Sequence, residues 1–319
     1  MISVILGLVG NFLVMLVLFQ RRHTGSSADT FIGNLAAADF LSSLFLIPLP
    51  RATRVPSTLL GKLYCKIVFT SFLVWLCIFT STLTLMAISV ERFVAIVYPI
   101  QFARFRNRRH INEGIISIWG LSLVVNLFIP LTMHVSDESN QCKVEFMTYT
   151  SQIIIGVMTA LVCYIIPISV MLVTNVTAAR KLHRQFKRFR STLPGEFNGQ
   201  STASLNLLHA RKRVLYMLIL VVIIYAICWG PNTIAYFLYN IRILDPLYLY
   251  GPVDRILVLL AFYNSCANPI VYTLRYPRFR KALRNVFTCS KVSSNAIFEF
   301  NNTGPKTNHD KDKITMTAM

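Results

Sequence analysis

Long apolar stretches alternate with shorter polar segments along this chain of 319 residues. Several stretches reach the roughly 20 residues that a helix needs to cross the hydrocarbon core of a bilayer. The pattern predicts seven membrane-spanning helices, near residues 1–20, 29–50, 66–97, 113–133, 150–176, 213–240 and 253–274. The expected fold class is an all-α membrane protein, a bundle of seven transmembrane helices with a short amphipathic eighth helix.

The sixth and seventh predicted helices each contain a proline, Pro231 and Pro269. A proline inside a helix removes a backbone donor and leaves the carbonyl four residues earlier without its usual partner. In hydrocarbon a freed carbonyl must find another partner within the protein, and an asparagine such as Asn268 can supply one. We therefore expect both helices to act as hinges. Trp229 is expected to sit on the bend of the sixth helix and to face inward.

The segment after the seventh predicted helix, residues 276–288, is amphipathic. Phe279, Leu283 and Phe287 recur there every four residues, with basic residues between them. This pattern is typical of a helix that lies in the membrane interface. Cys289 at its end is a candidate for palmitoylation, and an unmodified cysteine is the alternative.

The chain divides by composition into two parts. Residues 1–289 are expected to form one membrane domain. Residues 290–319 are polar, rich in Asn, Lys, Asp and Thr, and are expected to be a disordered tail. Within the domain, residues 191–210 are rich in Ser, Gly, Asn and Leu, and we expect a flexible linker between the fifth and sixth helices.

Basic residues outnumber acidic ones by 32 to 13 and give a net charge of +19. They cluster after the first, third, fifth and seventh predicted helices, which places all four clusters on one side of a membrane. Cytoplasmic loops carry such an excess of Lys and Arg. We therefore expect a plasma-membrane protein with its N-terminus outside the cell and its C-terminus in the cytoplasm. The same distribution argues against nucleic-acid binding as the reason for the charge.

Several classes of function are disfavoured by composition. Charged residues make up only 14% of the chain, against about a quarter in a soluble domain. The seven cysteines show no Cys-x-x-Cys pair and no metal-site spacing with histidine. Neither His-Glu-x-x-His nor Gly-x-Ser-x-Gly is present. We expect no enzyme and no cofactor other than a bound cation.

The candidate cation site centres on Asp39, in the middle of the second predicted helix. A carboxylate at that depth is costly and requires a partner. Ser81, Asn264 and Asn268 are intramembrane polar residues that can converge on it. Because these ligands are hard oxygens, Na⁺ is the expected ion. The alternative is that each polar residue only makes a hydrogen bond between helices.

Glu91, Arg92 and Phe93 end the third predicted helix. An arginine at the cytoplasmic edge of a bundle can change its ion-pair partner when helices move. The alternative is a side chain that extends to the interface and anchors the helix there.

In order and spacing, these motifs resemble those of the rhodopsin-like (class A) G-protein-coupled receptors, over residues 1 to about 289. The matching motifs are Gly10-Asn11, Asn34-Leu35-Ala36-Ala37-Ala38-Asp39, Glu91-Arg92-Phe93, Trp119, Pro167, Cys228-Trp229-Gly230-Pro231 and Asn268-Pro269-Ile270-Val271-Tyr272. The resemblance implies a receptor that activates a heterotrimeric G protein when an extracellular ligand binds, with arrestin as a further partner. Its second helix, third helix and seventh helix carry the family's sodium site and switch motifs.

The resemblance also implies roles for individual residues. Asp39, Ser81, Asn264 and Asn268 would hold sodium, Cys65 and Cys142 would form an extracellular disulfide, and Arg92 with Ile100 would contact the G protein. The implied activation switch consists of Glu91, Arg92, Trp229, Pro231, Asn268, Pro269 and Tyr272.

The ligand class follows from a general similarity to neuropeptide receptors of the somatostatin, galanin and RFamide type. Val74 stands where amine receptors carry an Asp, and Phe262 where visual pigments carry a Lys, which argues against both subclasses. Glu145 and Asp254 are candidate anchors for a cationic peptide. From helical phase we expect a pocket wall of Ser71, Trp75, Ile78, Asn232, Tyr236, Asp254, Val258 and Phe262. A receptor for a non-peptide small molecule and, more remotely, a cation-coupled transporter are the alternatives.

This chain departs from the family pattern at several positions. Tyr225 replaces the usual Phe of the sixth helix, and Arg211 stands where some members carry a Glu that pairs with the arginine of the third helix. Cys65 lies two residues further from Arg92 than is usual. Because Met1 is only nine residues before Gly10, we expect a natural protein with a longer extracellular tail.

Overall fold

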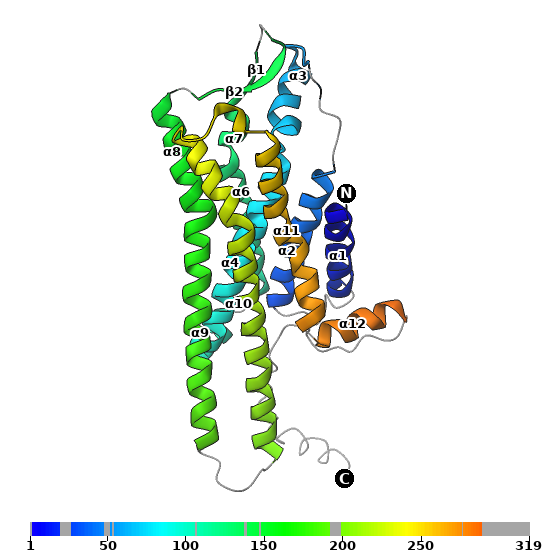
Figure 1. Ribbon diagram of the computed structural model, residues 1–319. Coiled ribbons are helices and arrows are strands. Elements are labelled where there is room, and N and C mark those ends of the chain that lie inside the picture. The colour runs from blue at the N-terminus through cyan, green and yellow to red at the C-terminus, as the bar shows by residue number, and fades with distance from the viewer. Residues whose placement is uncertain are drawn as a thin grey trace, which may run out of the picture.

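A computed structural model describes residues 2–19, 27–47, 52, 54–105, 107–136, 139–146, 148–191, 199–275 and 277–288. Within these ranges the chain is largely helical (Figure 1). The first half contains α1 (Ile2–Phe19), α2 (Ser27–Phe45), α3 (Leu59–Leu63), the π-helix η1 (Tyr64–Phe69), α4 (Phe72–Val97), α5 (Pro99–Phe105), α6 (Arg108–Asn126) and α7 (Phe128–Leu131). The second half contains α8 (Tyr149–Ala160), the π-helix η2 (Leu161–Ile165), α9 (Ile166–Ser191), α10 (Gly199–Asn240), the short 3₁₀-helix η3 (Pro246–Tyr248), α11 (Pro252–Arg275) and α12 (Pro277–Phe287).

The long helices form one bundle, with α8, η2 and α9 joined end to end as a single rod (Figure 1). Among the described residues, six helical segments are long and apolar enough to cross a membrane. The segments are Ile2–Phe19, Leu59–Val97, Arg108–Leu131, Tyr149–Arg188, Arg211–Asn240 and Pro252–Leu274. The helix α2 is less apolar because it carries Asp29, Asp39 and several serines, which it buries against its neighbours α1 and α4.

One end of the bundle is covered by a β-hairpin, and we call it the hairpin end. Its antiparallel strands are β1 (Met133–Ser136) and β2 (Gln141–Val144), with Met133 opposite Val144 and Val135 opposite Cys142. Figure 1 shows the hairpin at the top of the molecule and α12 at a steep angle to the foot of α11. We call the opposite end the α12 end.

Local sequence explains where several helices begin and stop. The Thr148 side chain accepts a hydrogen bond from the Ser151 N–H, and Ser151 returns one to the Thr148 backbone, which is a capping box at the start of α8. Asn107 caps α6 in a similar way. The helix α2 ends at Phe45, earlier than the predicted bound near residue 50, because prolines at positions 48 and 50 disfavour helical backbone before them.

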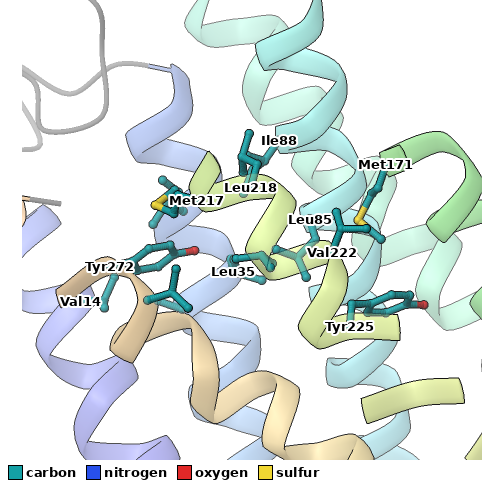
Figure 2. Packing of buried hydrophobic residues seen from close by; sticks show 14 of the residues in the cluster. Val14, Leu35, Leu85, Ile88, Met171, Met217, Leu218, Val222, Tyr225 and Tyr272 are labelled. Atoms are coloured by element: carbon teal, nitrogen blue, oxygen red, sulfur yellow. The ribbon is translucent and has the colours of Figure 1, made fainter. Parts of the chain in front are cut away.

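The apolar core lies on the α12 side of the bundle's middle. Side chains from α1, α2, α4, α9, α10 and α11 interlock there (Figure 2). The labelled members include Val14, Leu35, Met171, Val222 and Tyr272. In contrast, α6 and the α8–α9 rod bury few of their apolar side chains within the protein. Their outer faces are suited to lipid, which is an apolar solvent.

The carbonyl that Pro269 leaves without its helical donor belongs to Ser265, four residues earlier. The side-chain amide of Asn11 donates to this carbonyl at 3.3 Å and to the Gly7 carbonyl at 2.9 Å. The freed group is therefore satisfied from α1, and not from the adjacent Asn268 that the sequence suggested. Asn268 instead donates to Asp39, as described below.

Two helices extend further than the apolar pattern predicted. Both α9 and α10 continue well past the foot of the other helices at the α12 end (Figure 1). Residues 199–210, expected to belong to a flexible linker, form the first turns of α10. The extensions are rich in Ala, Leu, Lys and Arg, which have high helix propensity whether or not they face lipid. Cys289 and the tail 290–319 lie outside the described residues.

Candidate functional site

The clearest cavity opens between the helices at the hairpin end. Of the pocket residues expected from sequence, Trp75, Ile78, Asn232, Tyr236 and Asp254 line it. They come from α4, α10 and α11, so the structure brings together side chains that are up to 179 positions apart in sequence. Aromatic and aliphatic side chains dominate the walls, a composition typical of ligand pockets.

Three expected pocket residues do not line this cavity: Ser71, Val258 and Phe262. Ser71 lies in a left-handed turn (φ 55°) between η1 and α4, and its neighbour Thr70 lines the cavity instead. Phe262 is fully buried and packs toward Gly7 of α1. Helical phase misplaced Ser71 because it assumed one unbroken α-helix through residue 71, whereas Val258 and Phe262 lie within α11 but outside the cavity lining.

The hairpin and its flanking segments form a part of the cavity wall that sequence reasoning missed. Met133, Val144 and Phe146 line the cavity, together with Phe128 and Ile129 of α7. The disulfide between Cys65 and Cys142 holds this hairpin to η1. Side chains on a strand alternate between two faces, so Cys142 and Val144 share a side. This alternation is the sequence signal that could have predicted the position of Val144 once Cys142 was placed.

Among the described residues that line the cavity, Asp254 is the only charged one. It is 8% exposed, near the first turn of α11, and its carboxylate accepts a hydrogen bond from the Tyr250 N–H at 2.9 Å. Burial and, second, the negative charge of Asp254 raise the pKa of Tyr248 in the adjoining loop to about 12. Glu145, the other expected anchor, lies outside the cavity lining and pairs with His134 at 2.9 Å.

Trp229 lies at the inner boundary of this cavity, one turn beyond Tyr225 on α10. Its ring centre is 6.3 Å from that of Trp75 and 6.3 Å from that of Tyr225. The indole N–H is buried and makes no hydrogen bond with the described residues. A group that enters the cavity can therefore contact a ring stack on α10 next to Pro231.

Tyr225 connects α10 to the α8–α9 rod. Its hydroxyl donates to the Cys163 carbonyl at 2.6 Å. That carbonyl belongs to the π-helix η2 and precedes Pro167 by four residues, so the proline cannot supply its usual helical donor. The Tyr225 ring also stacks on Tyr164, with ring centres 5.9 Å apart. Tyr225, which replaces the usual Phe, thus donates a hydrogen bond to the Cys163 carbonyl, which Pro167 leaves without its helical donor.

A second cluster lies deeper in the bundle, around Asp39. Asp39 is fully buried, and its Oδ2 accepts a hydrogen bond from the Asn268 amide at 2.8 Å. Ser81 and Asn264 are buried as well. Within the described part of the chain, Asp39 Oδ1, Ser81 Oγ and Asn264 Oδ1 have no hydrogen-bond partner. Buried polar atoms are rarely left in this state, and all three are hard oxygens.

The model of the 7 transmembrane receptor (rhodopsin family) matches residues 10–272 of this sequence. The chain belongs to this family. It is therefore a rhodopsin-family receptor and a multi-pass membrane protein, and the expectation of a non-enzymatic receptor is confirmed.

Several similar proteins are peptide receptors by name. Galanin receptor 2b of Danio rerio is 30% identical over 311 residues, covering 93% of this chain and 76% of the relative. The allatostatin-A receptor of Bombyx mori is 27% identical and covers 89% and 77%. Somatostatin receptor type 2 of Sus scrofa is 27% identical and covers 91% and 76%. The predicted resemblance to the galanin and somatostatin group is confirmed.

The receptor's expected disulfide, Cys65–Cys142, is present although Cys65 is further from Arg92 than is usual in the family. The π-helix η1 contains Cys65, and the left-handed turn at Ser71 follows it. A π-turn closes over five residues where an α-turn closes over four. These two irregularities provide the places where additional chain length is taken up above α4.

Glu91 and Arg92 of the predicted activation switch form an ion pair at the α12 end. Arg92 is 5% exposed, and its Nε lies 3.2 Å from Glu91 Oε2. Ser27 of α2 donates to Glu91 Oε1 at 2.5 Å. Ile100 on α5 is 77% exposed. Arg92 is therefore paired with the adjacent Glu91, and the Glu91 carboxylate also accepts a hydrogen bond from Ser27 of α2.

Tyr272 and Asn34 join further helices of the receptor. Tyr272 is buried in the apolar core (Figure 2). Its ring meets that of Phe279 of α12 edge-on, with ring centres 6.3 Å apart. Asn34 donates to Thr84 Oγ1 at 2.9 Å and accepts from Trp119 Nε1 at 2.9 Å. The polar side chain of Asn34 thus connects α2, α4 and α6.

Proposed function

We propose that this rhodopsin-family receptor binds an extracellular peptide that carries a cationic group and, in response, activates a heterotrimeric G protein. In this proposal the receptor lies in the plasma membrane with the hairpin end outside and the α12 end in the cytoplasm. The exposed basic residues Arg180, Lys181, Arg184 and Lys187 on α9 support this orientation, since cytoplasmic segments carry the excess of Lys and Arg.

The observation that carries the proposal is the buried Asp254 in a cavity whose other described lining residues are uncharged and largely aromatic or aliphatic. A carboxylate in a partly desolvated cavity favours an ammonium or guanidinium group, while the aromatic walls favour an apolar side chain next to it. Peptides readily supply both. The names of the galanin, allatostatin-A and somatostatin receptors support a peptide over another ligand class.

The proposal predicts that Asp254→Asn lowers the potency of an activating peptide that contains Lys or Arg by about tenfold, because one charge-assisted hydrogen bond is weakened. Peptide-dependent nucleotide exchange on a G protein measures this effect, after a library of basic neuropeptides has supplied the activating sequence. Asp245→Asn is the matched control, since Asp245 lies in the loop before α11, caps η3 and does not line the cavity. Equal potency losses in the two variants would argue against Asp254 as the anchor.

A receptor for a non-peptide small molecule is the competing proposal, and the library distinguishes it, because no peptide would then activate the receptor. The transporter alternative is superseded by the family match. In the proposed mechanism a ligand shifts the receptor toward a state with α10 displaced, to the extent that it binds that state more tightly. Arg92 and Ile100 would then contact the G protein, and arrestin would bind the same end.

We further propose that Asp39, Ser81, Asn264 and Asn268 hold an allosteric Na⁺. The three unpartnered oxygens around Asp39 support this, because Na⁺ is a hard cation that oxygen ligands suit. The ion would supply positive charge to the Asp39 carboxylate, which accepts a hydrogen bond from Asn268. Asp39 would be the charged ligand, and the other three would complete the shell.

Sodium binding predicts a specific stabilisation. Replacing potassium chloride by sodium chloride at equal ionic strength is expected to raise the free energy of unfolding by about 1.4 kcal/mol when sodium is near ten times its dissociation constant. The midpoint of thermal unfolding should rise accordingly. In Asp39→Asn the difference between the two salts should vanish. Asp29→Asn, on the same helix but outside the cluster, should keep it. A sodium effect that persists in Asp39→Asn would place the ion elsewhere.

A further inference from the structure

The exposed side chains of α10 fall on one stripe. Tyr216, Ile223, Ile227 and Ile234 are between 49% and 62% exposed. They are separated by seven, four and seven residues, which at 3.6 residues per turn places them on the same side of the helix. Intervening residues such as Val221 and Val222 are buried in the core. The stripe therefore faces the lipid.

The same stripe continues toward the α12 end, but there it is basic. Lys212 and Arg213 are exposed and lie four and three residues before Tyr216, and His209 lies seven before it. These four side chains line a hollow on the surface of the protein. Lys212 Nζ is 5.7 Å from the centre of the Tyr216 ring, and the His209 ring packs edge-on against Phe186 of α9 at 5.2 Å. None of the described residues that line the hollow is acidic.

The level of this hollow along the helix corresponds to the headgroup layer. With a rise of 1.5 Å per residue, Arg213 and Lys212 lie about 5 and 6 Å beyond Tyr216. The polar layer on each side of a bilayer core is roughly 5–8 Å thick. Tyr216 is of the residue type that gathers at the boundary between core and headgroups. Hence the two cations are placed where lipid phosphates lie.

We propose that the hollow formed by His209, Lys212, Arg213 and Tyr216 binds the headgroup of an anionic phospholipid, with its acyl chains along Ile223 and Ile227. Guanidinium and ammonium groups are suited to phosphate oxygens. The apolar stripe directly below accommodates the chains of the same molecule. An acidic protein segment would fit the charges but not the lipid-facing stripe with which the hollow is continuous. The proposal rests on the proposed orientation only in assigning the lipid to the cytoplasmic leaflet, where anionic lipids are concentrated.

The test is lipid binding by the purified full chain in detergent, followed by native mass spectrometry. The probe is phosphatidylinositol 4,5-bisphosphate, and phosphatidylcholine is the neutral comparison. In Lys212→Gln/Arg213→Gln we expect the apparent affinity for the anionic lipid to fall by about tenfold, since two basic side chains near the headgroup are removed. Binding of phosphatidylcholine should not change.

The matched control is Arg184→Gln/Lys187→Gln, which also removes one Arg and one Lys. On α9 these exposed residues flank Phe186, which packs against His209, so they lie at about the level of the hollow. Neither residue lines the hollow, so this pair tests whether basic charge at this depth is sufficient on its own. The control is expected to change the affinity by less than twofold. Equal losses in both variants would indicate diffuse attraction to a basic protein and would overturn the proposal.

Two further measurements use the unmodified receptor. A photoactivatable acyl chain on the anionic lipid should form adducts on α10 between Tyr216 and Ile227, and adducts confined to other helices would refute the site. Soluble inositol 1,4,5-trisphosphate should compete only weakly, because it lacks the chains that the stripe contacts. Competition as strong as that of the intact lipid would show a phosphate site independent of the membrane and would overturn the assignment to a lipid. Binding of an acidic peptide in preference to the lipid would do the same.

Discussion

Replacing Cys65 and Cys142 together by serine is expected to produce a large loss of stability. The disulfide links residues 77 positions apart, and the chain-entropy model assigns about 4.5 kcal/mol to a loop of that length, as an upper bound. An unfolded state that keeps membrane helices has less entropy to lose, so roughly half of this value is expected. Thermal unfolding of the purified receptor in detergent measures the effect.

The reductant provides the control for this experiment. Reduction should lower the unfolding midpoint of the natural sequence to that of the double variant and should leave the variant unchanged. An equal midpoint for both proteins under oxidising conditions would contradict the prediction. The hairpin also carries Met133 and Val144 of the cavity wall, so the double variant should respond to an activating peptide with lower potency as well.

Removing one hydroxyl group, in Tyr225→Phe, is expected to raise ligand-independent nucleotide exchange. The substitution leaves the Cys163 carbonyl buried without the donor that Pro167 cannot supply. An unsatisfied buried carbonyl costs about 1–3 kcal/mol. If α10 moves away from the α8–α9 rod during activation, the hydrogen bond from Tyr225 is already broken in the active state. The substitution then destabilises only the resting state. A shift of about 2 kcal/mol corresponds to roughly thirtyfold in the ratio of the two states.

Tyr164→Phe is the matched control for this prediction. The Tyr164 hydroxyl donates to the Ala226 carbonyl at 3.2 Å, and that carbonyl also has the Gly230 N–H available four residues on. Its loss should leave basal exchange within about twofold of the natural receptor. Basal exchange that is unchanged in Tyr225→Phe would show that this hydrogen bond survives activation or contributes nothing to the balance.

Much of the bundle could be predicted because apolar length and helix crossing are tightly linked in a bilayer. The contact between Asp39 and Asn268 was also foreseeable, since a buried carboxylate needs a donor and few polar residues lie at its depth. The donor for the Ser265 carbonyl was harder to identify. Asn11 fills that role from another helix, whereas Asn268 lies only three positions from Ser265, so proximity in sequence pointed to the wrong side chain.

The cavity was predicted only in part, for a different physical reason. Helical phase correctly indicated Trp75 and Asn232, which lie within regular helix. It failed at Ser71, where the backbone is left-handed, and the π-helices η1 and η2 left no mark in the hydrophobic pattern. The start of α10 was missed because its Ser, Thr and Asn residues are typical of a linker, although the Leu and Ala residues among them favour helix.

The wide turn of η1 also has an evolutionary consequence. An extra residue in a regular helix rotates everything beyond it by about 100°, which in a packed bundle would turn core side chains outward. A π-turn confines that rotation to the short stretch between Cys65 and Thr70, while α4 keeps its register with the other helices. A single-residue insertion or deletion there could therefore alter the side chains above α4 while the helices toward the α12 end keep their packing.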